Sequence, residues 1–98
     1  GWPLWKLLGG NAARKVKAYA GGVALGWQDP KALVDEIAPH VALGYKAVKL
    51  RVGDTVERDI ARVTAVRSTY GDTLTILVDA NTGYAIGDVL FFKPTYEN

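Results

Sequence analysis

Apolar and polar positions along the chain follow two periods, one typical of strands and one typical of helices. Residues 16–20, 46–52 and 74–78 are short runs rich in valine and other strand-forming residues, bounded by turn residues, which predicts three strands. Two segments between them have apolar residues three or four positions apart, which predicts amphipathic helices: Leu33, Ile37 and Val41 in the first, and Ile60, Val63, Val66 and Tyr70 in the second. The order strand, helix, strand, helix, strand indicates an α/β fold with a parallel sheet.

Local signals predict where the first helix begins and ends. Asp29 occupies an N-cap position, and Pro30 has the fixed φ that suits a first helical residue. Gly44 is a suitable C-terminal cap. Pro39 lacks an amide proton and its ring crowds the preceding turn, so we expect a kink or an early end near Ala38.

The second half of the chain carries similar signals. Asp54 and Glu57 have the spacing of a capping box, which predicts that Asp54 caps the second helix. The run 74–78 is apolar on both faces, as expected of a strand that is buried under helices. A third helix is expected to begin within residues 85–90.

Polar side chains stand where two of the predicted strands end. Residues two apart on a strand point the same way, so Lys49 and Arg51 share one face of their strand, and Asp79 and Asn81 share one face of theirs. In parallel sheets the carboxyl ends of the strands meet at one edge, where ligands bind. The pattern therefore predicts two cations, a carboxylate and an amide at one sheet edge, which resembles half of an active site.

Composition excludes several other classes of protein. The 98 residues make at most one small domain, and the net charge of +2, with scattered lysines and arginines, argues against a nucleic-acid partner. No apolar run approaches the roughly 20 residues that cross a bilayer, so we expect no membrane partner. Cysteine is absent, which fits a reducing, cytoplasmic location. The tryptophans are expected to be core or interface aromatics: Trp2, Trp5 and Trp27.

Four segments, in order, resemble the mandelate racemase and muconate-lactonizing enzyme family of the enolase superfamily. Residues 1–10 resemble the lead into the barrel, 44–53 the second barrel strand, 59–67 the following helix and 78–81 the third strand. The resemblance implies that residues 1–90 are the N-terminal part of a (β/α) TIM-barrel domain. Residues 91–98 do not match it and are expected to be a separate tail.

The resemblance also implies a chemistry, namely Mg²⁺-assisted removal of a proton next to a carboxylate. The enolate-like intermediate of such a reaction needs strong electrostatic stabilisation, which a hard cation supplies. By the resemblance, Asp79 would be one of three acidic metal ligands. Lys49 would face the carboxylate of a small substrate, and Asn81 would hydrogen-bond near the metal or the substrate.

The sequence departs from the family at one position with direct chemical consequences. Most racemases of the family carry a lysine base two residues after the position of Lys49, where this chain has Arg51. Arginine stays protonated, so it is a poor base and a good clamp for a carboxylate. The substitution favours a one-base sugar-acid dehydratase or a similar lyase over a two-base racemase, and a cycloisomerase-like activity stays open.

The other two acidic ligands of the family lie on later strands that this sequence does not contain. The sequence also lacks methionine, so we expect a fragment of a longer chain. One carboxylate holds Mg²⁺ poorly, and we therefore expect this chain by itself neither to retain the metal nor to catalyse the reaction.

Three strands of an eight-stranded barrel would leave unpaired edges. Such edges invite pairing with another chain, so we expect a homo-oligomer. An alternative is a compact open sheet whose exposed face is covered by Phe91 and Phe92. The alternative function is a non-catalytic oligomeric α/β binding or structural module with Lys49 and Arg51 in its pocket.

A receiver-like signalling domain also has an aspartate at the end of its third parallel strand, which would be Asp79 here. The first predicted strand, residues 16–20, ends without the acidic pair that holds Mg²⁺ in such domains. The receiver interpretation is therefore disfavoured.

Overall fold

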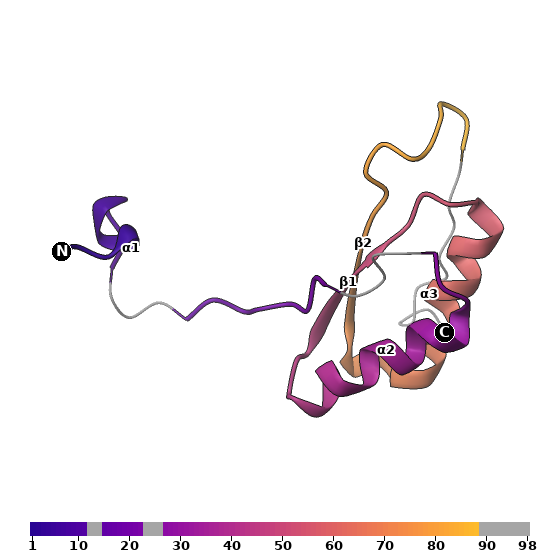
Figure 1. Ribbon diagram of the computed structural model, residues 1–98, viewed down its shortest axis with the longest axis horizontal. Helices are drawn as coiled ribbons and strands as arrows, with labels where there is room; N and C mark the ends of the chain where they lie inside the picture. Colours follow the sequence, from indigo (N-terminus) through magenta and orange to yellow (C-terminus); the bar gives the residue numbers. More distant parts are fainter. Residues whose placement is uncertain (12–14, 23–26, 89–98) are drawn as a thin grey trace.

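The structure is a computed structural model that describes residues 1–11, 15–22 and 27–88. In chain order its elements are helix α1 Leu4–Leu7, helix α2 Pro30–Ala42, strand β1 Ala47–Arg51, helix α3 Val56–Tyr70, 3-10 helix η1 Gly71–Thr73 and strand β2 Thr75–Asp79. Figure 1 shows α2 and α3 together on one side of the two strands, with the N-terminal arm and α1 extending away from this body.

The two strands lie side by side and parallel, joined through α3. Their register pairs Ala47 with Thr75 at one end and Arg51 with Asp79 at the other. The prediction of an α/β fold with a parallel sheet is thereby confirmed for these two strands, and the carboxyl ends of both lie at the same edge.

The predicted strand at residues 16–20 is wrong for most of its length. One isolated parallel bridge joins Ala20 to Val48, where the Ala20 amide donates to the Ala47 carbonyl at 2.9 Å and the Lys49 amide donates to the Ala20 carbonyl at 3.0 Å. Residues 15–19 are exposed, and Val16 retains 85% of its accessible surface. A strand is stabilised by packing of its side chains, which this segment lacks.

The core lies between β1 and the two helices. It contains these buried residues: Ala20, Leu33, Ile37, Val48, Leu50, Val52, Val63, Val66 and Leu74. Val48 and Leu50 alternate with Lys49 and Arg51 along β1, so the helices cover the apolar face of the strand. The polar residues are thereby left on the opposite face.

Helix α2 begins as predicted, because Asp29 accepts a hydrogen bond from the Ala32 amide at 2.8 Å and Pro30 is the first helical residue. The expected early end near Ala38 is wrong, since the helix continues through Pro39 to Ala42. Pro39 is exposed, so the carbonyl that loses its partner there can be hydrated. Gly44 follows with φ +97°.

The predicted cap of α3 is wrong by one residue. Thr55 is the N-cap, and its hydroxyl oxygen accepts a hydrogen bond from the Arg58 amide at 3.2 Å. Asp54 instead pairs with Arg62, 2.9 Å from its Nη2. Both Asp and Thr favour N-cap positions. Which of the neighbouring residues Asp54 and Thr55 caps α3 is therefore decided by a tertiary contact, namely the pairing of Asp54 with Arg62.

Strand β2 is more exposed than its apolar sequence predicted. Leu77 and Val78 retain 40% and 42% of their accessible surface, and in the described part of the chain β2 pairs with β1 alone. Residues 85–88 are not helical, so the helix expected to begin within residues 85–90 does not begin at these four residues, and residues 89–90 lie outside the described residues. Phe91 and Phe92 lie outside the described residues.

Two of the three tryptophans lie on the N-terminal arm, outside the core. Trp2 and Trp5 are exposed, and Figure 1 shows α1 far from the two-strand sheet. Trp27, immediately before α2, is 45% exposed and is also not a core residue.

Candidate functional site

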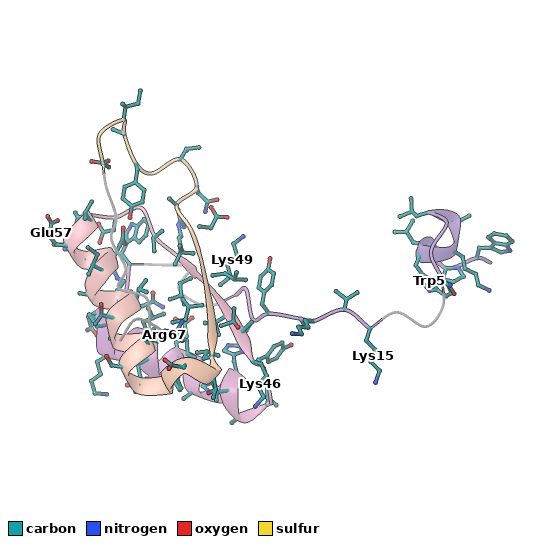
Figure 2. The ribbon with its side chains drawn as sticks, turned by 180° about the vertical axis from the view of Figure 1, so that it is seen from behind. Trp5, Lys15, Lys46, Lys49, Glu57 and Arg67 are labelled. Carbon is teal, nitrogen blue, oxygen red and sulfur yellow. The ribbon has the colours of Figure 1, made fainter. Side chains whose placement is uncertain are left out.

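The carboxyl edge of the sheet brings together residues that the sequence analysis singled out. Nζ of Lys49 lies 2.9 Å from Oδ2 of Asp79, joining β1 to β2. Figure 2 shows Lys49 projecting from the sheet on the side away from the helices. Arg51 lies two residues after Lys49 and is in register with Asp79, so all three residues belong to this face.

The contact between Lys49 and Asp79 changes the pKa of both side chains. The hydrogen bond from Lys49 lowers the pKa of Asp79, and the Asn81 amide, 3.0 Å from Oδ1, lowers it further. The same hydrogen bond and charge raise the pKa of Lys49. Both side chains are therefore ionised at neutral pH, and because both are solvent-exposed the pair contributes little to folding stability.

Asn81 does not lie on β2 as the strand alternation implied. The strand ends at Asp79, and Asn81 has φ +45° in the turn that follows. Asparagine tolerates this left-handed conformation better than most residues. Its backbone amide contacts Asp79, so its placement beside the carboxylate comes from a turn instead of from a shared strand face.

Arg51 packs against an aromatic ring from another part of the chain. Its guanidinium carbon lies 4.9 Å from the centroid of Trp27, and that of Arg62 lies 5.7 Å from the same ring. Both distances are within the range of cation–π attraction. The loop before α2 thus reaches the carboxyl end of β1.

A buried ionic network beneath this edge was missed by the sequence analysis. Asp59 has no accessible surface, and its Oδ2 accepts hydrogen bonds from the amides of Gly53 at 2.8 Å and Asp54 at 3.2 Å and from the Tyr84 hydroxyl. Nη1 of Arg62 lies 3.2 Å from Oδ1 of Asp59. The spacing of three between an acid and a base on one helix was the signal available in the sequence.

Arg62 connects the network to α2. It retains 5% of its accessible surface, and its Nε donates to the Gln28 carbonyl at 2.6 Å. Its remaining nitrogens pair with Asp54 and Asp59. A buried charge needs such compensation, and here it fastens the residues before α2 to α3.

The loop after β2 is packed closely against the loop after β1. A Cβ added at Gly83 would lie 2.8 Å from the Gly53 carbonyl oxygen and 2.9 Å from that of Ala80. Gly53 itself has φ +107°, which favours glycine. Together with the Tyr84 contact, this packing fixes the turn that carries Asn81.

The described residues do not fit a complete magnesium site. Within residues 1–11, 15–22 and 27–88, no three His, Cys, Asp or Glu side chains lie close enough together to hold a metal ion. Asp79 supplies one carboxylate, whose oxygens contact Lys49 and the Asn81 amide. That donor set falls short of what Mg²⁺ requires.

One cavity lies at the opposite edge of the sheet. It has a volume of about 560 Å³ and is lined partly by Ala47 and Thr75, the first residues of the two strands. A smaller cavity of about 260 Å³ lies between the start of α2 and α3, beside Trp27 and Arg62. Neither cavity includes Lys49 or Asp79. No helix of the described residues is both long and apolar enough to span a membrane.

The chain is similar to known enzymes in sequence and to a solved protein in structure. The arabinonate dehydratase of Saccharolobus solfataricus is 41% identical over 90 residues, which are 90% of this chain and 24% of that protein. The 3,6-anhydro-alpha-L-galactonate cycloisomerase of Streptomyces coelicolor is 38% identical over 86 residues, covering 86% of this chain and 23% of that protein. The crystal structure of an enolase superfamily member from Polaromonas sp. JS666 is 52% identical, with a TM-score of 0.75 over 85% of this chain and 22% of that chain.

The chain thus spans about a quarter of the length of these relatives, among which are dehydratases, racemases and cycloisomerases. The family model for the enolase C-terminal domain-like family matches residues 32–93, more than half of the chain. The resemblance to the mandelate racemase and muconate-lactonizing enzyme family is thereby confirmed. The chain belongs to the enolase superfamily, as a member of the enolase C-terminal domain-like family.

Proposed function

We propose that the carboxyl edge of β1 and β2 is the carboxylate-binding part of an active site for proton removal next to a carboxylate. The observation that carries the proposal is the contact between Lys49 and Asp79 across neighbouring parallel strands. It brings the cation expected to face a substrate and the carboxylate expected to face a metal into one group of side chains. Ligand sites of α/β proteins lie at this edge.

The residues of this edge have different tasks in the proposal. Lys49 and Arg51 bind the carboxylate of a small substrate, and Asn81 hydrogen-bonds to it from the turn after β2. Asp79 contributes one carboxylate toward Mg²⁺, a cofactor of the wider enolase superfamily. Arg51 remains protonated and cannot accept the α-proton, which favours dehydration of a sugar acid with one base over two-base racemisation. The similarity to an arabinonate dehydratase, 41% identical, supports this preference over racemisation.

The 98-residue chain is proposed to bind carboxylates without catalysing the reaction, because its described residues supply one carboxylate to the metal and Arg51 where a base would be needed. The experiment has two parts. Incubation with arabinonate or gluconate and Mg²⁺ in D₂O should yield neither water loss nor deuterium at the α-carbon. Malonate binding, followed by calorimetry, should be saturable in the wild type and lost in Arg51→Ala.

Lys46→Ala is the matched control, because Lys46 precedes β1 at the opposite edge of the sheet and should leave malonate binding unchanged. Turnover of either sugar acid would overturn the proposed inactivity. Equal malonate affinity in the wild type and Arg51→Ala would overturn the proposed binding site.

The alternative is a non-catalytic homo-oligomeric module, and the exposed β2 strand favours it. Leu77 and Val78 are 40% and 42% exposed on a strand that could accept another chain. Light scattering with and without Mg²⁺ tests this alternative. A metal-independent dimer or larger assembly would support it, whereas a monomer at high protein concentration would exclude it.

A further inference from the structure

The ring of Trp27 contacts two guanidinium groups from different elements. Arg51, the last residue of β1, lies 4.9 Å from the ring centroid, and Arg62 of α3 lies 5.7 Å from it. Trp27 retains 45% of its accessible surface and is not a core residue. Its ring lies beside the carboxyl end of β1, where it contacts Arg51. Its most direct contact with the candidate site is therefore through Arg51.

The position of Trp27 is fixed by its neighbours in sequence. The carbonyl of Gln28 accepts a hydrogen bond from Nε of Arg62 at 2.6 Å. Asp29 caps α2 through the Ala32 amide, and Pro30 has a restricted backbone. The three residues after Trp27 are thus held in place by two hydrogen bonds and by the restricted backbone of a proline.

The Arg62 side chain is itself held in place by two carboxylates. Its Nη2 lies 2.9 Å from Asp54 and its Nη1 lies 3.2 Å from Asp59, which is completely buried. Charge-assisted hydrogen bonds of this kind are geometrically restrictive, so Arg62 presents a fixed surface to the indole. A continuous set of contacts therefore runs from the buried carboxylates through Arg62 and Trp27 to Arg51.

We infer that Trp27 is a positioning residue that holds the Arg51 guanidinium at the carboxyl end of β1 for a substrate carboxylate. An aromatic ring packed against a guanidinium restricts the rotamers of the arginine side chain before the ligand arrives. Restricting a side chain in its bound conformation strengthens binding, because less freedom is lost on association. This inference rests on the proposed function of Arg51 and adds a residue from another loop to that site.

The test compares Trp27→Leu, which removes the ring, with Trp27→Phe, which retains a smaller one. In the wild type the side-chain protons of Arg51 should be shifted upfield by the indole ring current in NMR spectra. The shift should disappear in Trp27→Leu and be partly retained in Trp27→Phe. Malonate affinity should fall about threefold to tenfold in Trp27→Leu and less in Trp27→Phe, as expected for removal of one cation–π contact.

Trp5→Leu is the control. Trp5 lies on α1, and its ring centroid is 5.6 Å from Nζ of Lys6, so this substitution also removes a cation–π contact, but one that does not involve Arg51. Both the Arg51 shifts and the malonate affinity should stay unchanged in this variant. Wild-type Arg51 protons at the shifts of a free arginine would contradict the inference, as would Trp27→Leu with unchanged malonate affinity. If the wild type fails to bind malonate, the proposed function is wrong, and the Arg51 ring-current shift alone then decides whether Trp27 positions the guanidinium. Should Trp27→Leu fail to fold, Trp27→Phe carries the test, and loss of the entire shift in that variant would contradict the inference.

Discussion

Lys49 on β1 and Asp79 on β2 form an ion pair across parallel strands, with Nζ 2.9 Å from Oδ2. The register places Lys49 opposite Leu77, so the pair is diagonal and spans two positions along β2. Diagonal neighbours are within reach of a long side chain such as lysine. Any cation that binds Asp79 must therefore compete with the Lys49 ammonium for the same carboxylate.

The first prediction concerns the buried Asp59. Asp59→Asn removes the charge that compensates Arg62 while keeping the size of the side chain. Breaking a buried ion pair in this way should lower the free energy of unfolding by about 3–5 kcal/mol, because the arginine stays buried without that partner. Urea denaturation followed by circular dichroism measures the loss.

The matched control is Asp35→Asn, which removes the exposed pair between Lys31 and Asp35 on α2. Exposed pairs of this kind contribute little, so its unfolding midpoint should stay close to that of the wild type. If Asp59→Asn were as stable as Asp35→Asn, the buried network would not stabilise the fold.

The second prediction concerns alkaline pH. The pKa of Tyr84 is raised to about 12, mainly by burial of the hydroxyl and secondly by its hydrogen bond to Asp59. A tyrosine in the unfolded chain titrates near pH 10, so the stabilisation from Tyr84 is complete below about pH 10 and is lost as the pH rises toward 12. Tyr84→Phe should lose about 1–2 kcal/mol at neutral pH and show a weaker decline between pH 10 and 12.

Tyr70 provides the necessary comparison for the alkaline experiment. Burial raises its pKa as well, and its hydroxyl donates to the Val34 carbonyl at 2.6 Å, so it titrates in both proteins. The difference between the two stability curves therefore isolates Tyr84. Parallel curves for wild type and Tyr84→Phe from pH 9 to 12 would count against the assigned contact with Asp59.

The third prediction tests the close approach of the two loops. In Gly83→Ala the new methyl group would meet the carbonyl oxygens of Gly53 and Ala80 at 2.8 and 2.9 Å, so the backbone must move. The free energy of unfolding should fall by about 1–3 kcal/mol, the usual effect of overpacking. Gly22→Ala is the control, since a Cβ there meets nothing within 4 Å. Thermal unfolding that is unchanged in Gly83→Ala would show that the loops do not pack as described.

Features governed by neighbouring residues were predictable from the sequence. The start of α2 follows from Asp29 and Pro30, whose side chains act within one turn. The alternation of Val48 and Leu50 with Lys49 and Arg51 identified the buried and polar faces of β1. That alternation also placed Asp79 near Lys49 once the strands were taken as parallel.

Features governed by distant contacts were not predictable in the same way. Asp59 and Arg62 were not among the predicted site residues, because two of their partners, Gln28 and Tyr84, are remote in sequence. The apolar sequence of β2 suggested burial, but burial depends on a covering element, and Leu77 remains 40% exposed. The position of Trp27 against Arg51 likewise depends on a contact between residues that are remote in sequence.

Acid titration of the Asp79 carboxyl carbon, followed by NMR, tests the contact between Lys49 and Asp79 most directly. We expect a pKa below the ordinary value of 3.8 in the wild type, because Lys49 and the Asn81 amide stabilise the carboxylate. In Lys49→Gln the pKa should move back toward that value, whereas Lys46→Gln should leave it low. A wild-type Asp79 that titrates at or above 3.8, unaffected by Lys49→Gln, would show that the two strands do not bring these residues together and would contradict the proposed site.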